Sequence, residues 1–346
     1  MIRDSAELLA RLRAIHVAIR DAVVAACEQS ATERLAVPLG NEGGDTIYAV
    51  DRISERVLLE HFADVAGRWS CVLVAEGLGP TGQTVLPLGT SADTAELRII
   101  VDPIDGTRGL MYQKRPAWIL TGVAPNRGAS TTLADIEMAV QTEIPLLKQH
   151  LCDALWVIGG EVGGERLDRV SDKRIRLAPR PSRAPTIAHG FGGLARFVPG
   201  GRDVLAAIDD AVAERLLGPV ERGSALTFED QYISTGGQLY ELLMGHDRWV
   251  ADVRPLLEPL LHERGRALGL CCHSYDLCTE SIARAAGVIV TDECGERLTA
   301  PLDVSTGVAW LGFANGQIRK EVWSVLPELL TAHGLAPCGG TKRVGD

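Results

Sequence analysis

The feature that most constrains this chain is an apolar run that leads into two carboxylates. Leu97–Val101 is short and rich in β-branched residues, which predicts a buried strand, and Asp102-Pro103-Ile104-Asp105-Gly106-Thr107 follows it. The residue before a proline is held extended, so Asp102 is expected at the end of that strand. Gly106 permits a turn that leaves backbone N–H groups pointing outward. Carboxylates with a carbonyl suit a divalent cation such as Mg2+, and exposed N–H groups suit a phosphate.

The same six residues are also compatible with an ordinary surface turn, so the neighbouring acids matter. A second apolar run, Cys71–Ala75, ends in Glu76 before a glycine-rich loop. Further along, Asp276 opens a segment that predicts an N-capped helix closed by Gly287 and followed by a strand. Taken singly, Asp276 is interpreted more readily as a helix cap than as a ligand. Together, the acids at these junctions favour a metal site.

In their order along the chain, these pieces resemble the inositol monophosphatase superfamily of Mg2+-dependent, lithium-sensitive phosphomonoesterases. The signature of that family is an early helical acid, a Glu after a short strand, the motif D-P-[IL]-D-G-[TS], and a W-D helix start. This chain supplies, in that order, Asp51, Glu76, 102–107 and Tyr275-Asp276. Arg222-Gly223-Ser224-Ala225 resembles the family's G-[ST]-A segment, and Thr235-Gly236-Gly237 resembles the strand and turn after it. The resemblance covers about Asp4 to Leu330.

The resemblance implies a set of metal ligands. Glu76, Asp102 and the Ile104 carbonyl would bind one Mg2+, and Asp102, Asp105 and Asp276 would bind a second. A phosphate monoester dianion repels an incoming hydroxide, so such a site must neutralise charge and stabilise the departing alkoxide. Asp102 is expected to bridge the two ions because its two oxygens can face opposite sides.

The resemblance also implies catalytic and phosphate-binding residues. Glu76 would act as general base and, with Thr107, would orient the attacking water. Asp51 would reach a more weakly held third ion through water. The expected phosphate- and substrate-binding residues are Gly106, Thr107, Arg108, Ser224 and Ala225.

Three departures from the family pattern bear on the substrate. Gly77 follows Glu76 where relatives have a second acid, so either two or three ions are expected. Arg108 stands where many relatives have Asn, and it either meets a second anionic group or is solvated. The stretch 246–270 is longer than in the inositol enzymes, and a helix from Leu256 to Leu268 is expected in it. That stretch is interpreted as a lid or a dimer contact.

The function that the resemblance implies is Mg2+-dependent hydrolysis of a small phosphorylated polyol or sugar. The first alternative is a phosphatase for a 3′-phosphonucleotide or a sugar bisphosphate. The second is a catalytically silent relative that binds a phosphorylated ligand. The silent relative is disfavoured because every expected ligand acid except the second of the Glu pair is present. Relatives are commonly homodimers, so a homodimer is expected.

Patterning along the chain suits the same fold class. Asp4–Glu7 resembles a capping box, and apolar residues then recur at helical spacing to about Ala26. A second helix is expected from Asp51 to about Val65, and strand signals dominate to about Leu177. The resemblance implies an α+β or α/β architecture, the layered α-β-α-β-α sandwich of the inositol monophosphatase and sugar phosphatase type. Because 346 residues exceed a single core, we expect domains 1–180 and 181–346, linked at Pro179–Pro185.

Composition excludes several classes of protein. A formal net charge of -10 argues against a nucleic-acid partner, which demands clustered Lys and Arg. No apolar run approaches the roughly 20 residues that span a bilayer, and Met1–Ser5 lacks an apolar signal core, so a cytoplasmic enzyme without a membrane partner is expected. The cysteines near Cys271-Cys272-His273 lack paired C-x-x-C spacing. All eight cysteines are therefore expected to be reduced thiols.

Overall fold

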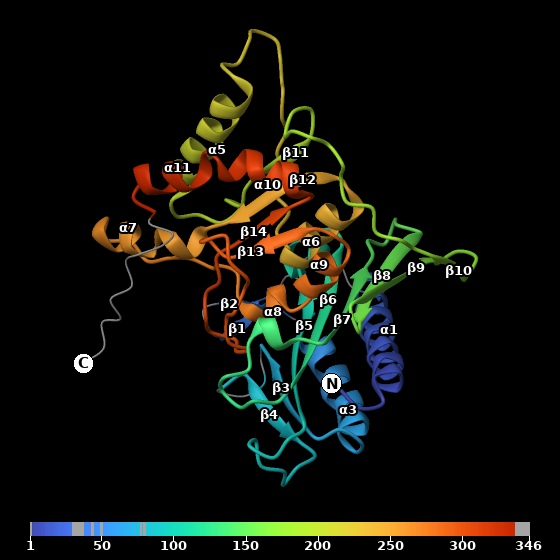
Figure 1. The fold of residues 1–346 in the computed structure, drawn as a ribbon. Coiled ribbons are helices and arrows are strands. Elements are labelled where there is room, and N and C mark those ends of the chain that lie inside the picture. Colours follow the sequence, from blue (N-terminus) through green and yellow to red (C-terminus); the bar gives the residue numbers. More distant parts are fainter. Residues whose placement is uncertain are drawn as a thin grey trace.

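Two mixed β-sheets form the framework of the protein (Figure 1). The computed structural model describes residues 2–29, 38–42, 45–48, 51–76, 78 and 81–335, and of 38–56 it describes only backbone elements. The larger sheet has eight strands in the order β10-β9-β8-β7-β6-β5-β3-β4, and the smaller has four in the order β11-β12-β14-β13. Only β3 and β5 pair in parallel in the first sheet, and only β11 and β12 in the second.

The strands of the larger sheet are β3 (Cys71–Ala75), β4 (Gln83–Leu86), β5 (Leu97–Asp105), β6 (Ala117–Pro125), β7 (Met138–Ile144), β8 (Leu151–Ile158), β9 (Glu161–Asp168) and β10 (Lys173–Arg176). Those of the smaller sheet are β11 (Phe191–Leu194), β12 (Asp247–Asp252), β13 (Ile289–Thr291) and β14 (Trp310–Phe313). A separate hairpin pairs β1 (Pro38–Glu42) with β2 (Asp45–Tyr48). The predicted strand signals up to about residue 177 are thus confirmed.

Helices α1 (Ser5–Gln29) and α3 (Asp51–Ala66) lie against one face of the larger sheet. Helix α1 buries Leu8, Leu12 and Ile19 in an apolar cluster that also contains Ile99 and Val101 of β5. Their spacing of four and seven residues places them on one helical face, as the sequence predicts. Burial of such side chains contributes about 1.5–3 kcal/mol each.

A middle layer of three helices lies between the sheets: α6 (Thr235–Met244), α8 (Ser274–Leu277) and α9 (Glu280–Ala285). The outer face of the smaller sheet is covered by α5 (Arg202–Leu217), α10 (Gly316–Trp323) and α11 (Leu326–Ala332), at the top of Figure 1. Each interface between layers has its own apolar cluster. This arrangement confirms the predicted α-β-α-β-α sandwich; the domain boundary near residue 180 stays a prediction.

Several predicted helices are shorter than expected. The expected helix from Leu256 to Leu268 is instead a 3-10 turn, Arg254–Leu257, followed by α7 (Glu258–Glu263). The helix expected after Asp276 is interrupted between α8 and α9, and Thr279, which lies in the gap, donates its hydroxyl to Gln141 at 3.1 Å. Such side-chain hydrogen bonds compete with helix continuation, and they depend on tertiary contacts that no local pattern records.

One expectation about the cysteines is wrong. Cys294, in the turn after β13, is disulfide-bonded, whereas the other cysteines of the described ranges are free: Cys27, Cys71, Cys152, Cys271, Cys272 and Cys278. Cysteine spacing in the sequence does not reveal a pairing that the fold brings about.

Within the residues that the structure describes, none of the helices combines the length and the apolar character needed to cross a membrane.

Candidate metal centre

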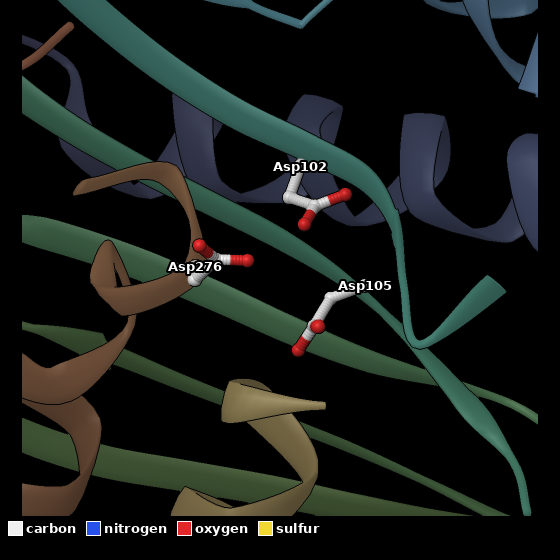
Figure 2. A group of neighbouring side chains, drawn as sticks. All are labelled: Asp102, Asp105 and Asp276. Carbon is white, nitrogen blue, oxygen red and sulfur yellow. The ribbon is translucent and has the colours of Figure 1, made fainter. Parts of the chain in front are cut away.

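The first four residues of the six-residue motif, Asp102–Asp105, lie within strand β5 rather than after it. Opposite β6, Asp102 pairs with Leu120 and Asp105 with Trp118, so β5 accommodates one extra residue between them. Pro103 has no N–H to contribute, and the Ile104 N–H donates to Asp102 Oδ1 at 2.9 Å. The bulge directs both carboxylates toward the same side, as Figure 2 shows.

The third carboxylate comes from the middle layer. Asp276 lies in α8, which contacts β5, and its Oδ2 accepts the backbone N–H of His273 at 2.6 Å. Asp276 is therefore not the N-cap residue itself, which is His273, but the third residue of the helix, and its carboxylate completes the capping box. It also faces the other two aspartates (Figure 2). One ligand oxygen from each of Asp102, Asp105 and Asp276 lies within 4.8 Å of the others.

Helix α6 fixes the orientation of Asp105. Ser234 Oγ and the Gly236 N–H both donate to Asp105 Oδ2, at 2.8 and 2.6 Å. Ser234 also caps α6 by accepting the Gly237 N–H at 2.8 Å. A Cβ atom at residue 236 would lie 2.9 Å from Asp105 Oδ2 and 2.6 Å from Leu120, so only glycine permits this close approach.

Burial dominates the electrostatics of the cluster. Desolvation raises the pKa of Asp105 to about 6 and raises that of Asp102 well above its usual range, with further contributions from Asp105, Asp276 and Glu76. The pKa of Asp276 is also raised, first by burial and then by Asp105. Like charges this close do not all ionise unless a cation compensates them. An all-oxygen donor set of this kind fits a hard divalent cation such as Mg2+.

Three further predicted residues lie close to this cluster. Glu76 follows β3, and its charge raises the pKa of both Asp102 and Asp276. Thr107 begins α4 (Thr107–Met111), and its hydroxyl donates to the Ile104 carbonyl at 2.8 Å. A carbonyl has a second lone pair, so this bond does not exclude Ile104 as a metal ligand.

Of the other predicted site residues, Gly106 and Arg108 lie at the start of α4, next to the cluster in sequence, and Asp51 begins α3. Gly106 precedes α4 with φ 95, the left-handed conformation that the sequence requires of it. Arg108 is half-buried in α4. Asp51 begins α3, but its side chain is outside the described part, as is Gly77.

Ser224 and Ala225 are not brought to the cluster. Both are exposed on the loop after α5, which in Figure 1 rises above the body of the molecule. The residues of the second half of the chain that contact Asp105 include Ser234 and Gly236, neither of which was predicted as a site residue. Thr235–Gly237, expected as a strand and turn, opens α6 instead. A small polar residue before an apolar helical run is an N-cap signature, and that signal in the sequence identifies Ser234.

An arginine that the sequence interpretation did not single out is buried beside the cluster. Arg254 donates from Nε and Nη2 to the two oxygens of Asp252 at 2.8 and 2.5 Å, and from Nη1 to the Leu270 carbonyl at 2.7 Å. Its charge acts to lower the pKa of Asp276. Asp252 ends β12, a central strand of the smaller sheet, so the beginning of the stretch 246–270 is core structure rather than a lid.

Solved structures similar to this chain share its whole fold. The fructose-1,6-bisphosphatase of Leishmania major, in holo form, matches with a TM-score of 0.65 at 14% identity, covering 94% of this chain and 93% of its own. The extragenic suppressor protein SuhB of Bartonella henselae matches with a TM-score of 0.62 at 14% identity, covering 92% of this chain and 98% of its own. An IMPase of Thermotoga maritima matches with a TM-score of 0.59 at 16% identity, covering 94% of this chain and 100% of its own.

No protein-family model and no curated protein sequence matches this chain. The similarity to these structures, at such identities, therefore establishes the fold. It confirms, at the level of the fold, the resemblance that the motif Asp102–Thr107 predicts.

Proposed function

We propose that the protein is a Mg2+-dependent phosphomonoesterase acting on a small phosphorylated polyol or sugar. The observation that carries this proposal is the cluster of Asp102, Asp105 and Asp276, whose ligand oxygens lie within 4.8 Å of one another. The cluster occurs in a fold shared with a fructose-1,6-bisphosphatase and an IMPase. Carboxylates with raised pKa values in a buried site are typical of functional rather than structural positions.

In this proposal the chain's own residues bind and orient the reactants. Glu76 accepts a proton from the attacking water, and Thr107 orients that water. The N–H groups of Gly106 and Thr107 hold the phosphate. Bound Mg2+ supplies positive charge that offsets the phosphate dianion and favours a hydroxide nucleophile near neutral pH. Water adds to phosphorus, the ester P–O bond breaks, and the alcohol leaves with a proton.

A second candidate substrate is a sugar bisphosphate. Arg108 directly follows Thr107, and its guanidinium can bind a second anionic group. The similarity to a fructose-1,6-bisphosphatase supports the same candidate. Arg108→Ala should then raise KM for a bisphosphate more than it raises KM for a monophosphate.

Phosphate release from a panel of sugar phosphates, sugar bisphosphates, inositol phosphates and 3′-phosphonucleotides tests the proposal. Each reaction is run with Mg2+, with a chelator, and with Mg2+ plus Li+. We expect Mg2+-dependent turnover of one sugar or polyol class. Release from no member, while Mg2+ binding is measured calorimetrically in the same preparation, would favour the catalytically silent alternative.

A further inference from the structure

A cavity of about 700 Å³ lies away from the aspartate cluster. It is lined by the start of α1, the start of β7, the β8–β9 turn and α9, and by Arg297. None of the three clustered aspartates lines it. A cavity of this size falls within the range of small-molecule sites.

One residue that lines this cavity, Ser281, has an unpartnered hydroxyl. Ser281, in α9, is 7% exposed. Its Oγ is buried and has no hydrogen-bond partner within the ranges that the structure describes. A buried hydroxyl left unpaired costs about 1–3 kcal/mol, so native proteins seldom retain one without a reason. This unpaired group points to a polar atom of a bound molecule.

Two arginines supply positive charge to this cavity. Arg284 pairs with the buried carboxylate of Glu280, at 3.0 and 3.2 Å, and its side chain stays 38% exposed. Arg297 is exposed and donates one N–H to the Ala134 carbonyl at 2.6 Å. A guanidinium has five N–H donors, so both arginines retain donors for an anion. Glu280 pairs with Arg284, and the charged residues that line the cavity itself are the two arginines and Glu137.

The remaining walls of the cavity are mostly apolar, with Ser5 and Glu137 as the polar side chains. Ile136, Met138 and Val157 line it and are buried. Glu137 is exposed and accepts the Ile2 backbone N–H at 3.0 Å. An apolar wall opposite two guanidiniums suits a ligand that has both an apolar body and an acidic group.

We propose that this cavity binds a small amphipathic anion. Its apolar or aromatic body packs against Ile136, Met138 and Val157, and its carboxylate or phosphate contacts Arg284 and Arg297. The Ser281 hydroxyl donates to the same acidic group. The site is separate from the aspartate cluster and does not depend on the proposed phosphatase activity.

The experiment uses the full chain and 8-anilinonaphthalene-1-sulfonate, an aromatic anion whose fluorescence rises in apolar surroundings. The titration is run in a chelating buffer, so that divalent cations at the aspartate cluster contribute nothing. Arg297→Glu reverses a charge at the cavity, and Ser281→Leu removes the hydroxyl and fills space. Arg266→Glu makes the same charge change at an exposed arginine that does not line the cavity. Circular dichroism confirms that each variant is folded.

We expect one saturable site per chain. Its Kd should rise at least about tenfold in the Arg297→Glu and Ser281→Leu proteins and stay unchanged in the Arg266→Glu protein, because about 1.4 kcal/mol corresponds to a tenfold change. Should Ser281→Leu fail to fold, the comparison of the Kd values of the two arginine variants still tests the proposal. Absence of saturable binding, or equal Kd values in both arginine variants, would overturn the proposal.

Competition then identifies the acidic group. Displacement of the probe by benzoate assigns a carboxylate, and displacement by phenyl phosphate assigns a phosphate; either result supports the site. If neither compound displaces the probe at millimolar concentration, the assignment of an amphipathic-anion site is wrong.

Discussion

Single residues determine whether the aspartate cluster can bind a cation. Each carboxylate is held by a backbone N–H group: Asp102 by Ile104, Asp105 by Gly236 and Asp276 by His273. Since an ionised carboxylate has about four acceptor positions, these bonds orient the group and leave capacity for a metal. The same burial that raises the three pKa values makes the cluster costly unless a cation is bound.

The first prediction concerns cation binding by Asp102. Asp102→Asn removes one charge from the centre of the cluster and should weaken Mn2+ binding at least about 100-fold, because several kcal/mol of charge interaction is lost. Isothermal titration calorimetry measures the change. Asp210→Asn, at an exposed position in α5, is the matched control and should bind Mn2+ as the unmodified protein does. Equal affinities in the two variants would exclude Asp102 as a ligand.

The second prediction concerns His16, a buried histidine of α1. His16 is 1% exposed, its ring nitrogens contact the hydroxyls of Thr142 and Thr121 at 2.9 and 2.8 Å, and burial lowers its pKa to about 3. Between its unfolded pKa of about 6.5 and this value, only the unfolded chain binds the proton. The free energy of unfolding should therefore fall as pH is lowered through that window, by about 2 kcal/mol from pH 7 to pH 5.

Urea unfolding at pH 7 and at pH 5 measures this dependence. The loss on going to pH 5 should shrink in the His16→Gln protein, which no longer has the titrating group. It should persist in the His61→Gln protein, because His61 is exposed in α3. An unchanged pH dependence in both variants would contradict the assigned role of His16.

At the scale of elements, α6 connects helix stability with the geometry of the cluster. Ser234 accepts the Gly237 N–H at the start of α6 and donates its own hydroxyl to Asp105. A single side chain therefore caps the helix and orients a candidate metal ligand. Groups that orient metal ligands in this way typically change metal affinity by 10–100-fold when they are removed.

The third prediction separates these two roles. Ser234→Ala should cost about 1 kcal/mol of stability through the lost cap and should also weaken Mn2+ binding about tenfold or more. Asn315 caps α10 by accepting the N–H groups of Gln317 and Ile318, and α10 lies on the far side of the smaller sheet. Asn315→Ala should lower stability without changing Mn2+ affinity. If both variants bind Mn2+ equally, Ser234 is a helix cap only.

The spacing of apolar residues in the sequence correctly predicted the helices and strands that are determined by neighbouring residues. The helical spacing after Asp4–Glu7 correctly gave α1, and the β-branched run before Asp102 correctly gave β5. The bulge that carries β5 on to Asp105 was not predicted, because it depends on pairing with β6. Ser224 and Ser234 each lie next to small residues in the sequence, and only the packing of α6 against β5 shows which of them contacts Asp105.

At the scale of the whole molecule, the cluster exists only when separate layers pack together. Asp102 and Asp105 belong to the eight-stranded sheet, and Asp276 belongs to the middle layer of helices. A cation bound among them connects the two layers. The sequence motifs predicted the ligands through family resemblance, whereas their distance from one another depends on the fold.

The fourth prediction follows from this connection between layers. A cation that binds only the folded state should stabilise it by about 2.7 kcal/mol at a concentration 100 times its Kd. Thermal unfolding should therefore shift to higher temperature with added Mg2+, and the shift should be absent in the Asp102→Asn protein. An equal shift in both proteins would mean that Mg2+ acts elsewhere.

The most direct test of the account is the initial rate of phosphate release from the preferred sugar or polyol phosphate, measured side by side for the unmodified, Asp102→Asn and Asp210→Asn proteins. With Mg2+ we expect turnover by the unmodified and Asp210→Asn proteins, and a rate at least about 100-fold lower for Asp102→Asn, a loss of about 2.7 kcal/mol of transition-state stabilisation. A chelator should abolish turnover in all three. Full activity of a correctly folded Asp102→Asn protein, or turnover that persists with the chelator, would contradict a metal-dependent phosphatase centred on this cluster.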